Sequence, residues 1–340
     1  MRKFDTILAA ADESAIIRAA GLIRDGQVVA IPTETVYGLA ANALSPLAVA
    51  KIFEVKGRPA DNPLIVHISH LGELAQLTEN PPDIVYKLAE KFWPGPLTMV
   101  LPSSKVIPKL VRAGLDTVGI RLPGHPIARR LIEHAGLPLA APSANISGRP
   151  SPTAASHCLD DLDGLIPMVL DGGTCRVGVE STVLSLVGDT PRILRPGLVT
   201  PEQIELVAGR VEIDPAVYRK PTPNTPAASP GMLHTHYSPK AEVVILSGDW
   251  QNCRRYMAAQ PDGCFGLVFE EELDDCPLPA LSLGRVDDNL AHAHNLFSLL
   301  RELDQDGATK VFARAPKDEG VGLAVYNRLI RAAAFNEIKL

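Results

Sequence analysis

Short apolar runs alternate with amphipathic segments over residues 1–208. Residues 12–25 carry Ile and Ala at helical spacing, which predicts a helix, and the apolar run 27–31 predicts a buried strand. The same criteria predict further helices at 48–55, 81–93, 126–136, 153–162 and 201–207. They predict further strands at 64–68, within 93–101, and at 116–123, 137–141, 168–174, 178–184 and 191–197. Interspersed helices and strands indicate an α/β fold, here with a sheet of mixed strand direction.

Two details of this pattern make specific predictions. The strands 168–174 and 178–184 are joined by a glycine-rich segment, so we expect them to pair across a turn. Thr200 directly precedes the helix 201–207, and a threonine in that position is a favourable N-cap.

The pattern changes after residue 208. Residues 209–240 contain several prolines and no periodicity, which predicts a semi-rigid linker. Residues 241–340 alternate again, with strands expected at 241–247, 264–269, 279–283 and 309–313 and helices at 250–259, 288–304 and 320–334. We therefore predict a first α/β domain at 1–208, the linker at 209–240 and a smaller Rossmann-like α/β domain at 241–340.

Composition narrows the class of protein. The apolar fraction of 46% and the charged fraction of 21% are ordinary for a soluble globular chain. A formal net charge of −6 disfavours a surface built broadly for nucleic acid, although it is compatible with a local basic cleft. The chain has five cysteines without a CxxC pair, no signal-like N-terminus and no apolar run of membrane-spanning length. We therefore expect a cytoplasmic protein with free thiols and no membrane segment.

Two cations stand in the polar loop before the strand at 64–68. Lys56 and Arg58 are two residues apart, so an extended backbone directs both side chains to the same side. An ammonium and a guanidinium together suit a phosphate group, and Pro59 and Pro63 favour a rigid loop. The alternative is a pair of solvated loop charges, and this loop alone does not decide between the two.

Polar side chains also gather where other buried strands end. Thr35 lies in a hydroxyl-rich turn of the kind that forms ligand sites in open sheets, although it also fits a helix N-cap. Arg121 lies inside an apolar strand, so it either reaches the surface or faces a carboxylate. The loop 142–153 is rich in small hydroxyl residues. It suits a closely approaching ligand, or else a surface loop that ends in an N-cap at Ser151 or Thr153.

These loops collectively resemble the YrdC-like family. Seven motifs occur in the family's order and spacing: PTETVYGL (32–39), KGRPADNPLIVHI (56–68), WPGPLT (93–98), DTVGIRLPGHP (116–126), APSANISGRPSPT (141–153), DGG…GVESTV (171–183) and LRPG (194–197). The SPGM…HYSP segment (229–239) and the C-terminal α/β domain resemble the long, two-domain form, the threonylcarbamoyl-AMP synthases. The resemblance implies a YrdC-like catalytic domain with a twisted, open, mixed sheet, and a linker that folds as a flap over the site.

The resemblance also implies a reaction. In that family ATP, L-threonine and bicarbonate or CO2 give threonylcarbamoyl-AMP and pyrophosphate, and Mg2+ accompanies the ATP phosphates without a direct protein ligand. The threonine amine is carbamoylated first, and the carbamate oxygen then attacks the α-phosphorus of ATP. The product serves N6-threonylcarbamoylation of adenosine 37 in tRNAs that read codons beginning with A. The implied partners are therefore the tRNA threonylcarbamoyl-transfer machinery and, weakly, tRNA itself.

Site residues follow from the matched motifs. The resemblance implies a polar tetrad of Lys56, Arg58, Ser143 and Asn145, with the two cations on the phosphates. It implies further nucleotide contacts from Asn62, Thr117, Ser151, Arg195 and Tyr237. It implies a threonine pocket of Thr35, His67, Arg121, Ser181 and the backbone at Ala141, with Arg121 on the substrate carboxylate. Thr235 departs from the family, which often has lysine before the HY pair, so this chain lacks that ammonium.

Two other functions stay open at this point. The first is an RNA-binding module without turnover, which the net charge and the scarcity of interleaved aromatic and basic residues disfavour. The second is a carbamoyl-handling relative that uses a different acceptor. Threonine-dependent release of pyrophosphate distinguishes the predicted enzyme from the RNA-binding module, and a comparison with serine distinguishes it from the carbamoyl-handling relative.

Overall fold

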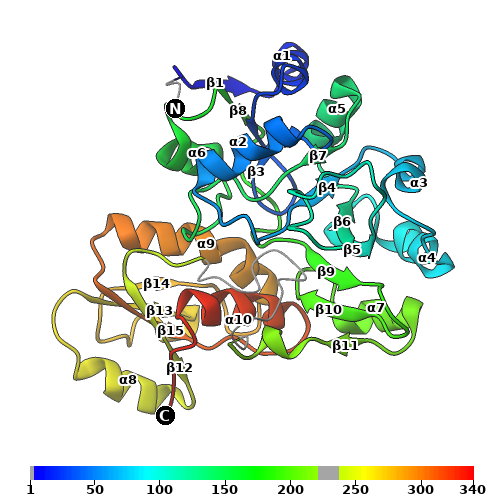
Figure 1. The fold of residues 1–340 in the computed structure, drawn as a ribbon. Helices are drawn as coiled ribbons and strands as arrows, with labels where there is room; N and C mark the ends of the chain where they lie inside the picture. The colour runs from blue at the N-terminus through cyan, green and yellow to red at the C-terminus, as the bar shows by residue number, and fades with distance from the viewer. Residues whose placement is uncertain (1–3, 221–236) are drawn as a thin grey trace.

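The computed structural model describes residues 4–220 and 237–340 and shows two α/β lobes (Figure 1). The N-terminal lobe is built on an 11-stranded sheet with the strand order β1-β8-β2-β3-β7-β4-β6-β5-β9-β10-β11. Neighbouring strands pair in both directions: β4 is parallel to β6, for example, whereas β5 is antiparallel to β6. The predicted open, mixed sheet is therefore confirmed.

The strands of this sheet are short. Their bounds are β1 Ile7–Ala10, β2 Val29–Ile31, β3 Gly38–Asn42, β4 Ile65–His67, β5 Leu97–Pro102, β6 Thr117–Arg121, β7 Leu139–Ala140, β8 Met168–Asp171, β9 Thr182–Ser185, β10 Arg192–Arg195 and β11 Glu212–Ile213. The apolar pattern did not predict β1, β3 or β11, and β11 lies in the segment predicted as a linker. β1 is an edge strand with alternating exposure, and β3 consists mainly of Gly and Ala, which have low strand propensity.

Helices cover the sheet. Their bounds are α1 Glu13–Arg24, α2 Pro46–Lys56, α3 Leu74–Leu77, α4 Asp83–Phe92, α5 Pro126–Ala135, α6 Ala155–Leu162 and α7 Pro201–Ala208, with 3₁₀ turns at Leu71–Glu73 and Pro215–Val217. The predicted cap of α7 is confirmed, because the Thr200 hydroxyl accepts a hydrogen bond from the N–H of Gln203. The alternative of an N-cap for α6 at Ser151 or Thr153 is wrong: its N-cap is Ala154, and the Ser151 and Thr153 hydroxyls bind Glu180 and Ser298 instead.

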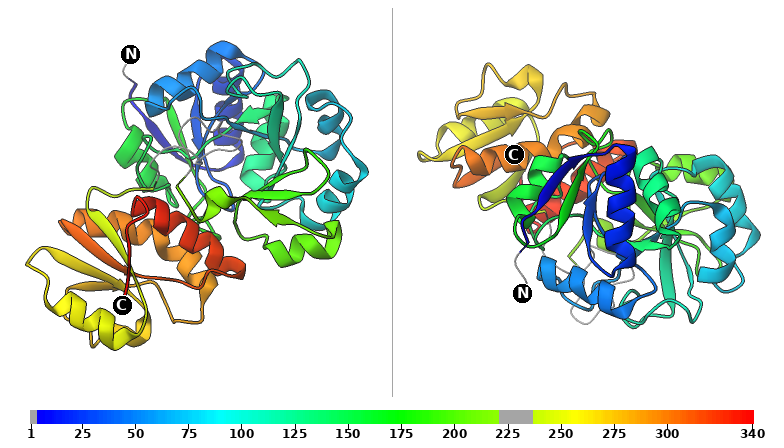
Figure 2. Two further views of the ribbon diagram at one scale, coloured as in Figure 1. Left: turned by 60° about the horizontal axis from the view of Figure 1, so that its bottom comes forward. Right: turned by 90° about the horizontal axis from the view of Figure 1, so that it is seen from above.

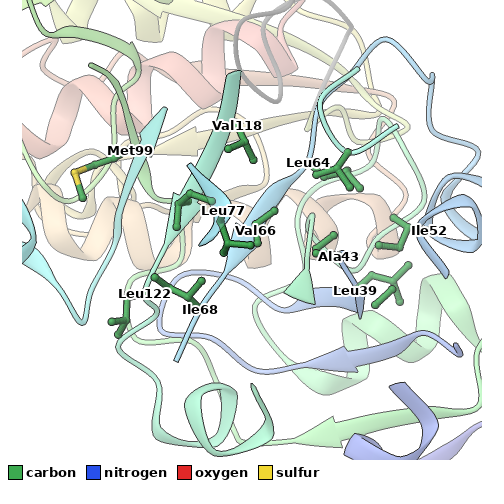
Figure 3. Close-up of a cluster of buried hydrophobic side chains, with 14 of the residues drawn as sticks. Leu39, Ala43, Ile52, Leu64, Val66, Ile68, Leu77, Met99, Val118 and Leu122 are labelled. Carbon is green, nitrogen blue, oxygen red and sulfur yellow. The ribbon is translucent and has the colours of Figure 1, made fainter. Parts of the chain in front are cut away.

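The apolar run 64–68 connects the core to the opposite face of the sheet. Its alternate residues Leu64, Val66 and Ile68 belong to the largest buried cluster, part of which is shown in Figure 3. Because side chains alternate along a strand, Ile65 and His67 point to the other face. β4 therefore fills the core with one face and presents His67 on the other.

β8 and β9 do not pair with each other, so the predicted hairpin across 168–184 is wrong. β8 lies between β1 and β2, whereas β9 lies between β5 and β10. The glycine-rich segment between them spans much of the sheet. The Tyr37 hydroxyl donates to the Gly173 carbonyl (2.7 Å) and accepts from the Gly172 N–H (3.1 Å). A Cβ atom on Gly172 would lie 2.6 Å from Cγ of Pro32, so this glycine permits a close approach of two segments, whereas Gly173 adopts φ +81° with nothing within 4 Å of an added Cβ.

The C-terminal lobe is a five-stranded parallel sheet with the order β14-β13-β15-β12-β16. Its strands are β12 Glu242–Ser247, β13 Cys264–Val268, β14 Ala280–Ser282, β15 Lys310–Arg314 and β16 Glu337–Lys339. Its helices are α8 Trp250–Ala258, α9 Asn289–Gln305 and α10 Gly320–Ala332, with a 3₁₀ turn at Glu270–Glu272. The predicted Rossmann-like pattern is confirmed, with β16 as an additional, half-exposed strand.

Helices α9 and α10 lie on the side of the C-terminal sheet that faces the N-terminal lobe, and α8 lies on the other side (Figure 1, Figure 2). The contact between the lobes is close, because a Cβ atom on Gly178 would lie only 2.4 Å from the carbonyl oxygen of Ala293 in α9. Ion pairs also cross it, including one of 2.9 Å between Arg301 Nη2 and Asp161 Oδ2. Among the helices of residues 4–220 and 237–340, none has the length and hydropathy that a membrane span needs.

Candidate active site

A cavity lies on the face of the N-terminal sheet that carries Ile65, His67 and Arg121, and its empty volume is about 580 Å³. The other lining residues are Thr33, Thr35, Val36, Gly38, Arg58, Ala141, Pro142, Ser143, Glu180, Ser181, Arg195 and Tyr237. These residues come from separate motifs of the sequence, so the fold brings the motifs together around one space.

The turn after β2 directs a chain of hydroxyl groups toward Arg121. The Thr33 hydroxyl donates to the Val36 carbonyl (2.6 Å) and lies 2.8 Å from the Thr35 hydroxyl. Because the Thr33 proton is used on Val36, Thr35 is the donor in the bond that the two hydroxyls share. Thr35 in turn accepts from Arg121 Nη1 (3.1 Å). The turn leads into β3, so neither threonine is a helix N-cap.

Arg121 is buried and faces a carboxylate, which confirms one of the two alternatives for this strand arginine. Its Nη2 lies 2.6 Å from Glu34 Oε1, and its Nε donates to the Gly95 carbonyl (3.3 Å). Burial opposes the charge on Glu34. The Arg121 cation and the N–H of Gly124 nevertheless hold the pKa of the Glu34 carboxyl below its ordinary value. Arg121 is therefore fixed in the cavity wall.

His67 lies beside Arg121 as a neutral side chain. The two are register partners in the parallel strands β4 and β6, and His67 is only 3% exposed. Burial, and then the Arg121 cation, lower the pKa of His67 to about 3. Within the described part of the chain its Nδ1 is buried and has no hydrogen-bond partner. The neutral His67 ring is one of the residues that line the cavity.

Lys56 supports the cavity without lining it. It is the last residue of α2, it is buried, and its Nζ donates to the carbonyls of Ser143 (2.5 Å) and Asn145 (2.5 Å). Burial, and then the neighbouring Arg58 cation, lower the pKa of the Lys56 ammonium well below its ordinary value. Lys56 therefore fixes the backbone of the 143–145 loop, and its phosphate contact stays a prediction.

Arg58 and Arg195 form a cationic wall of the cavity. Arg58 donates to the carbonyls of Asn62 (3.2 Å) and Pro63 (2.9 Å), and Arg195 donates to the carbonyl and the hydroxyl of Ser181 (3.1 and 3.2 Å). Burial lowers the pKa of Arg58 to about 10, so it remains charged at neutral pH. The alternative of solvated loop charges is wrong for this loop, because Lys56 is buried and Arg58 points into the cavity.

Glu180 is a second carboxylate at the cavity. The Ser151 hydroxyl donates to its Oε1 (2.5 Å), and Arg328 Nε of α10 donates to its Oε2 (2.9 Å). Burial opposes the charge on Glu180, but the cations of Arg328 and Arg195 hold the pKa of this carboxyl below its ordinary value. Glu180 is therefore ionised, and both of its oxygens are in use.

Tyr237 brings the end of the linker into the cavity wall. It is 5% exposed, its ring centroid lies 5.2 Å from that of Phe297, and the guanidinium carbon of Arg328 lies 6.0 Å from its ring. The next residue is also anchored, because the Ser238 N–H donates to the Gly148 carbonyl (2.8 Å). Of the linker and flap predicted at 209–240, residues 221–236, which include Thr235, lie outside the described residues.

The residues predicted for the site fall into two groups. Those that line the cavity are Thr35, Arg58, His67, Arg121, Ala141, Ser143, Ser181, Arg195 and Tyr237. Those that do not line it are Lys56, Asn62, Thr117, Asn145 and Ser151. In the second group Ser151 is fully buried beside Glu180, and Thr117 lies at the opposite end of β6 from Arg121, on the same face of the sheet.

No role is predicted from the sequence for Glu34, Glu180 or Arg328. For the two acids a signal was present: each stands in a short motif at the end or start of a buried strand, where a carboxylate needs a partner. Arg328 gave no such signal, because an arginine in a predicted amphipathic helix is usually solvated. Its contact with Glu180 depends on the packing of the C-terminal lobe against the N-terminal lobe, which the sequence of α10 alone does not show.

Known proteins share this architecture. The family profile of the Sua5, YciO and YrdC proteins, described as "Telomere recombination", matches residues 21–197. A second profile, described as "Threonylcarbamoyl-AMP synthase, C-terminal domain", matches residues 199–334. The second match begins before α7 and β11, so it includes the last part of the N-terminal lobe as well as the C-terminal lobe.

Curated relatives cover nearly the whole chain. A protein of Pyrococcus abyssi named threonylcarbamoyl-AMP synthase is 46% identical over 331 residues, which are 95% of this chain and 95% of that protein. A Bacillus subtilis protein of the same name is 45% identical over 329 residues, with 95% and 94% covered. A shorter Mycobacterium tuberculosis relative, named putative threonylcarbamoyl-AMP synthase, is 38% identical over 57% of this chain and 89% of its own length.

A solved structure agrees with the arrangement of both lobes. The crystal structure of Pyrococcus abyssi Sua5 complexed with L-threonine superimposes with a TM-score of 0.93 at 44% identity and covers 98% of this chain and 100% of that one. A variant of the same archaeal protein with a histidine and a tyrosine replaced by alanine gives a TM-score of 0.92. The motifs, both profiles and the shared fold lead to one conclusion: this chain belongs to the two-domain threonylcarbamoyl-AMP synthase family.

Proposed function

We propose that this chain synthesises threonylcarbamoyl-AMP from L-threonine, bicarbonate or CO2 and ATP, and releases pyrophosphate. One observation carries the proposal: a single cavity joins the cationic wall of Arg58 and Arg195 to a compact polar pocket at Thr35, His67 and Arg121. The wall suits phosphate groups, and the pocket suits a small amino acid. The Pyrococcus abyssi relative forms a complex with L-threonine in its crystal structure, which supports the same ligand here.

In this proposal the threonine carboxylate meets Arg121. Glu34 and Thr35 hold that guanidinium in place, so no reorganisation is needed when the substrate arrives. Both carboxylates near the pocket, Glu34 and Glu180, are paired with arginines, and His67 is neutral. Such a pocket disfavours an ammonium group and favours the uncharged amine, which is the form of threonine that adds to CO2.

The proposed chemistry needs positioning and charge neutralisation, not a protein nucleophile. The amine adds to the carbon of CO2 and loses a proton, which gives a carbamate. A carbamate oxygen then bonds to the α-phosphorus of ATP while the bond to the pyrophosphate oxygen breaks. Arg58 and Arg195 would balance the charge on the phosphates, and Lys56 would hold the 143–145 loop beside the reacting groups.

The donor set around the cavity fits a magnesium ion that arrives with ATP. In the described ranges 4–220 and 237–340 no three His, Cys, Asp or Glu side chains form a metal-binding group. The two carboxylates near the cavity are engaged by arginines. We therefore propose that phosphate oxygens and water hold Mg2+, which supplies neutralisation of phosphate charge when bound.

We also propose that the product passes to the tRNA threonylcarbamoyl-transfer machinery in the cytoplasm, for modification of position 37 in tRNAs that read codons beginning with A. Any contact of this chain with tRNA would be weak. The net charge of −6 supports that view, because a protein that binds nucleic acid broadly needs an excess of positive charge.

The test is pyrophosphate release by the full-length protein, with ATP, threonine and bicarbonate omitted in turn. We expect release only when all three are present, and release that is independent of threonine would refute the proposal. Serine turnover as fast as threonine turnover would instead identify a carbamoyl-handling relative with a different acceptor. Tight, steeply salt-dependent tRNA binding without turnover would identify an RNA-binding module.

A further inference from the structure

One arginine of the C-terminal lobe reaches the wall of the cavity. Arg328 of α10 is fully buried, although arginine is rarely so. Its Nε donates to Glu180 Oε2 (2.9 Å), its Nη2 donates to the Glu180 carbonyl (3.0 Å), and its Nη1 donates to the Pro196 carbonyl. All three nitrogens of the guanidinium therefore bind the N-terminal lobe.

The two segments that this arginine holds both carry residues of the site. Glu180 lines the cavity and precedes Ser181, and Pro196 follows Arg195. Arg195 donates to the carbonyl and the hydroxyl of Ser181, so the two segments are also bonded to each other. Ser151 extends the network, because its hydroxyl donates to the second carboxylate oxygen of Glu180. Through Glu180, one side chain of α10 thus connects three loops of the N-terminal lobe.

The negative charge of Glu180 links this network to the binding of ATP. Without its partner, Glu180 would be an unpaired anion at the wall that carries Arg58 and Arg195. It would compete for the guanidinium of Arg195 and repel incoming phosphates, and such interactions are strong where water is largely excluded. The pocket around Arg121 has its own carboxylate, Glu34, and depends less on Glu180.

We propose that Arg328 is a positioning residue for the nucleotide half of the site. It keeps Glu180 paired, so that ATP meets a wall of net positive charge. The proposal rests on the proposed function and extends it, because it gives the C-terminal lobe a part in binding ATP. If Arg328 had only a structural role, its loss would lower stability or weaken the binding of both substrates alike. The effect on ATP would then be no larger than the effect on threonine.

The test compares full-length Arg328→Gln, Glu180→Gln and the double variant. Arg255→Gln is the control, since Arg255 is an exposed arginine on α8, the helix on the far side of the C-terminal sheet. Two quantities are measured: the affinity for an ATP analogue that cannot be cleaved between the α- and β-phosphates, and the KM values for ATP and threonine. The first requires no turnover. A failure of threonine-dependent pyrophosphate release would therefore refute the proposed function without deciding this point.

For Arg328→Gln we expect ATP-analogue affinity to fall by about tenfold or more, as when one partner of a buried charge pair is removed. The KM for threonine should stay within about twofold of wild type. The double variant should regain most of the loss, because the unpaired charge is gone, and Arg255→Gln should behave as wild type. An equal effect on both substrates, or a double variant no better than Arg328→Gln, would overturn the proposal.

If melting curves show that Arg328→Gln does not fold, the ATP-analogue affinity of Glu180→Gln, compared with that of the wild type, tests the proposal. This variant removes the negative charge and leaves Arg328 in place, so we expect it to bind the ATP analogue at least as tightly as wild type. Weaker binding by a folded Glu180→Gln protein would show that the carboxylate itself helps to hold the nucleotide, and the proposal would be wrong.

Discussion

Lys56 and Arg58 stand two residues apart, yet the fold gives them different tasks. The Lys56 ammonium is buried and bonded to two carbonyls of the 143–145 loop. The Arg58 guanidinium lines the cavity and retains its charge. We expect turnover to require both residues, but loss of Lys56 would also remove the hydrogen bonds that hold the 143–145 loop.

Arg58→Ala and Lys56→Ala should each lower the rate of pyrophosphate release by about 10²-fold or more, as loss of a preorganised charge or its support usually does. Lys56→Ala should also lower the melting temperature, because the carbonyls of Ser143 and Asn145 lose their donor. Lys105→Ala, at an exposed lysine, is the control for the loss of a charge. Wild-type activity in either site variant would contradict its assignment.

His67 makes stability depend on pH. Its pKa is about 3 in the folded chain, compared with roughly 6.5 for an unperturbed histidine. As the pH falls below that ordinary value, the unfolded chain takes up a proton that the folded chain does not. The free energy of unfolding should therefore be unaffected by His67 above about pH 6.5 and should fall by up to ~1.4 kcal/mol per pH unit between about 6.5 and 3.

The measurement is urea unfolding of the wild type and of His67→Gln at pH 7 and pH 5. Because glutamine does not titrate, the variant should lose about 2 kcal/mol less between these pH values than the wild type loses. An unchanged difference in His67→Gln would mean that His67 is not neutral in the folded chain.

At the scale of elements, strand alternation explains what the sequence predicted well. In the run 64–68, alternate apolar residues enter the core, and His67 is left on the opposite face beside Arg121. Their proximity then follows from the parallel pairing of β4 and β6, which the pattern of a single strand does not contain. The wrong hairpin between β8 and β9 has the same origin: local glycines suggested a turn, but strand order depends on distant partners.

The loop before β9 also marks where the lobes touch. Gly178 has φ +86° and no room for a side chain, because a Cβ would lie 2.4 Å from the Ala293 carbonyl of α9. Gly188 has φ +96° but nothing within 4 Å of an added Cβ. The two glycines share the backbone requirement and differ only in the contact with the C-terminal lobe.

Gly178→Ala should therefore destabilise the protein by about 2 kcal/mol more than Gly188→Ala, since it adds a steric conflict to the same left-handed strain. The difference in unfolding free energy in urea measures this contact directly. Equal losses in the two variants would show that α9 does not pack on the Gly178 loop in solution.

For the whole molecule, the apolar pattern predicted the two α/β lobes, and the motifs predicted most of the residues around the cavity. They gave no role to Glu34, the partner of Arg121, or to Arg328, which reaches Glu180 from the other lobe. Both are contacts between segments far apart in the chain, and the second joins residues 148 positions apart. A motif shows that a charged residue is present, whereas its partner becomes known only from the tertiary structure.

The central claim is that one cavity joins threonine, through a carbamate, to the α-phosphate of ATP. The most direct measurement is mass spectrometry of the nucleotide product formed from ATP, threonine and bicarbonate labelled with a heavy carbon isotope. The account predicts an AMP adduct that contains both the threonine and the labelled carbon, with an equal amount of pyrophosphate. An adduct of AMP and threonine without the label, or AMP alone, would contradict it.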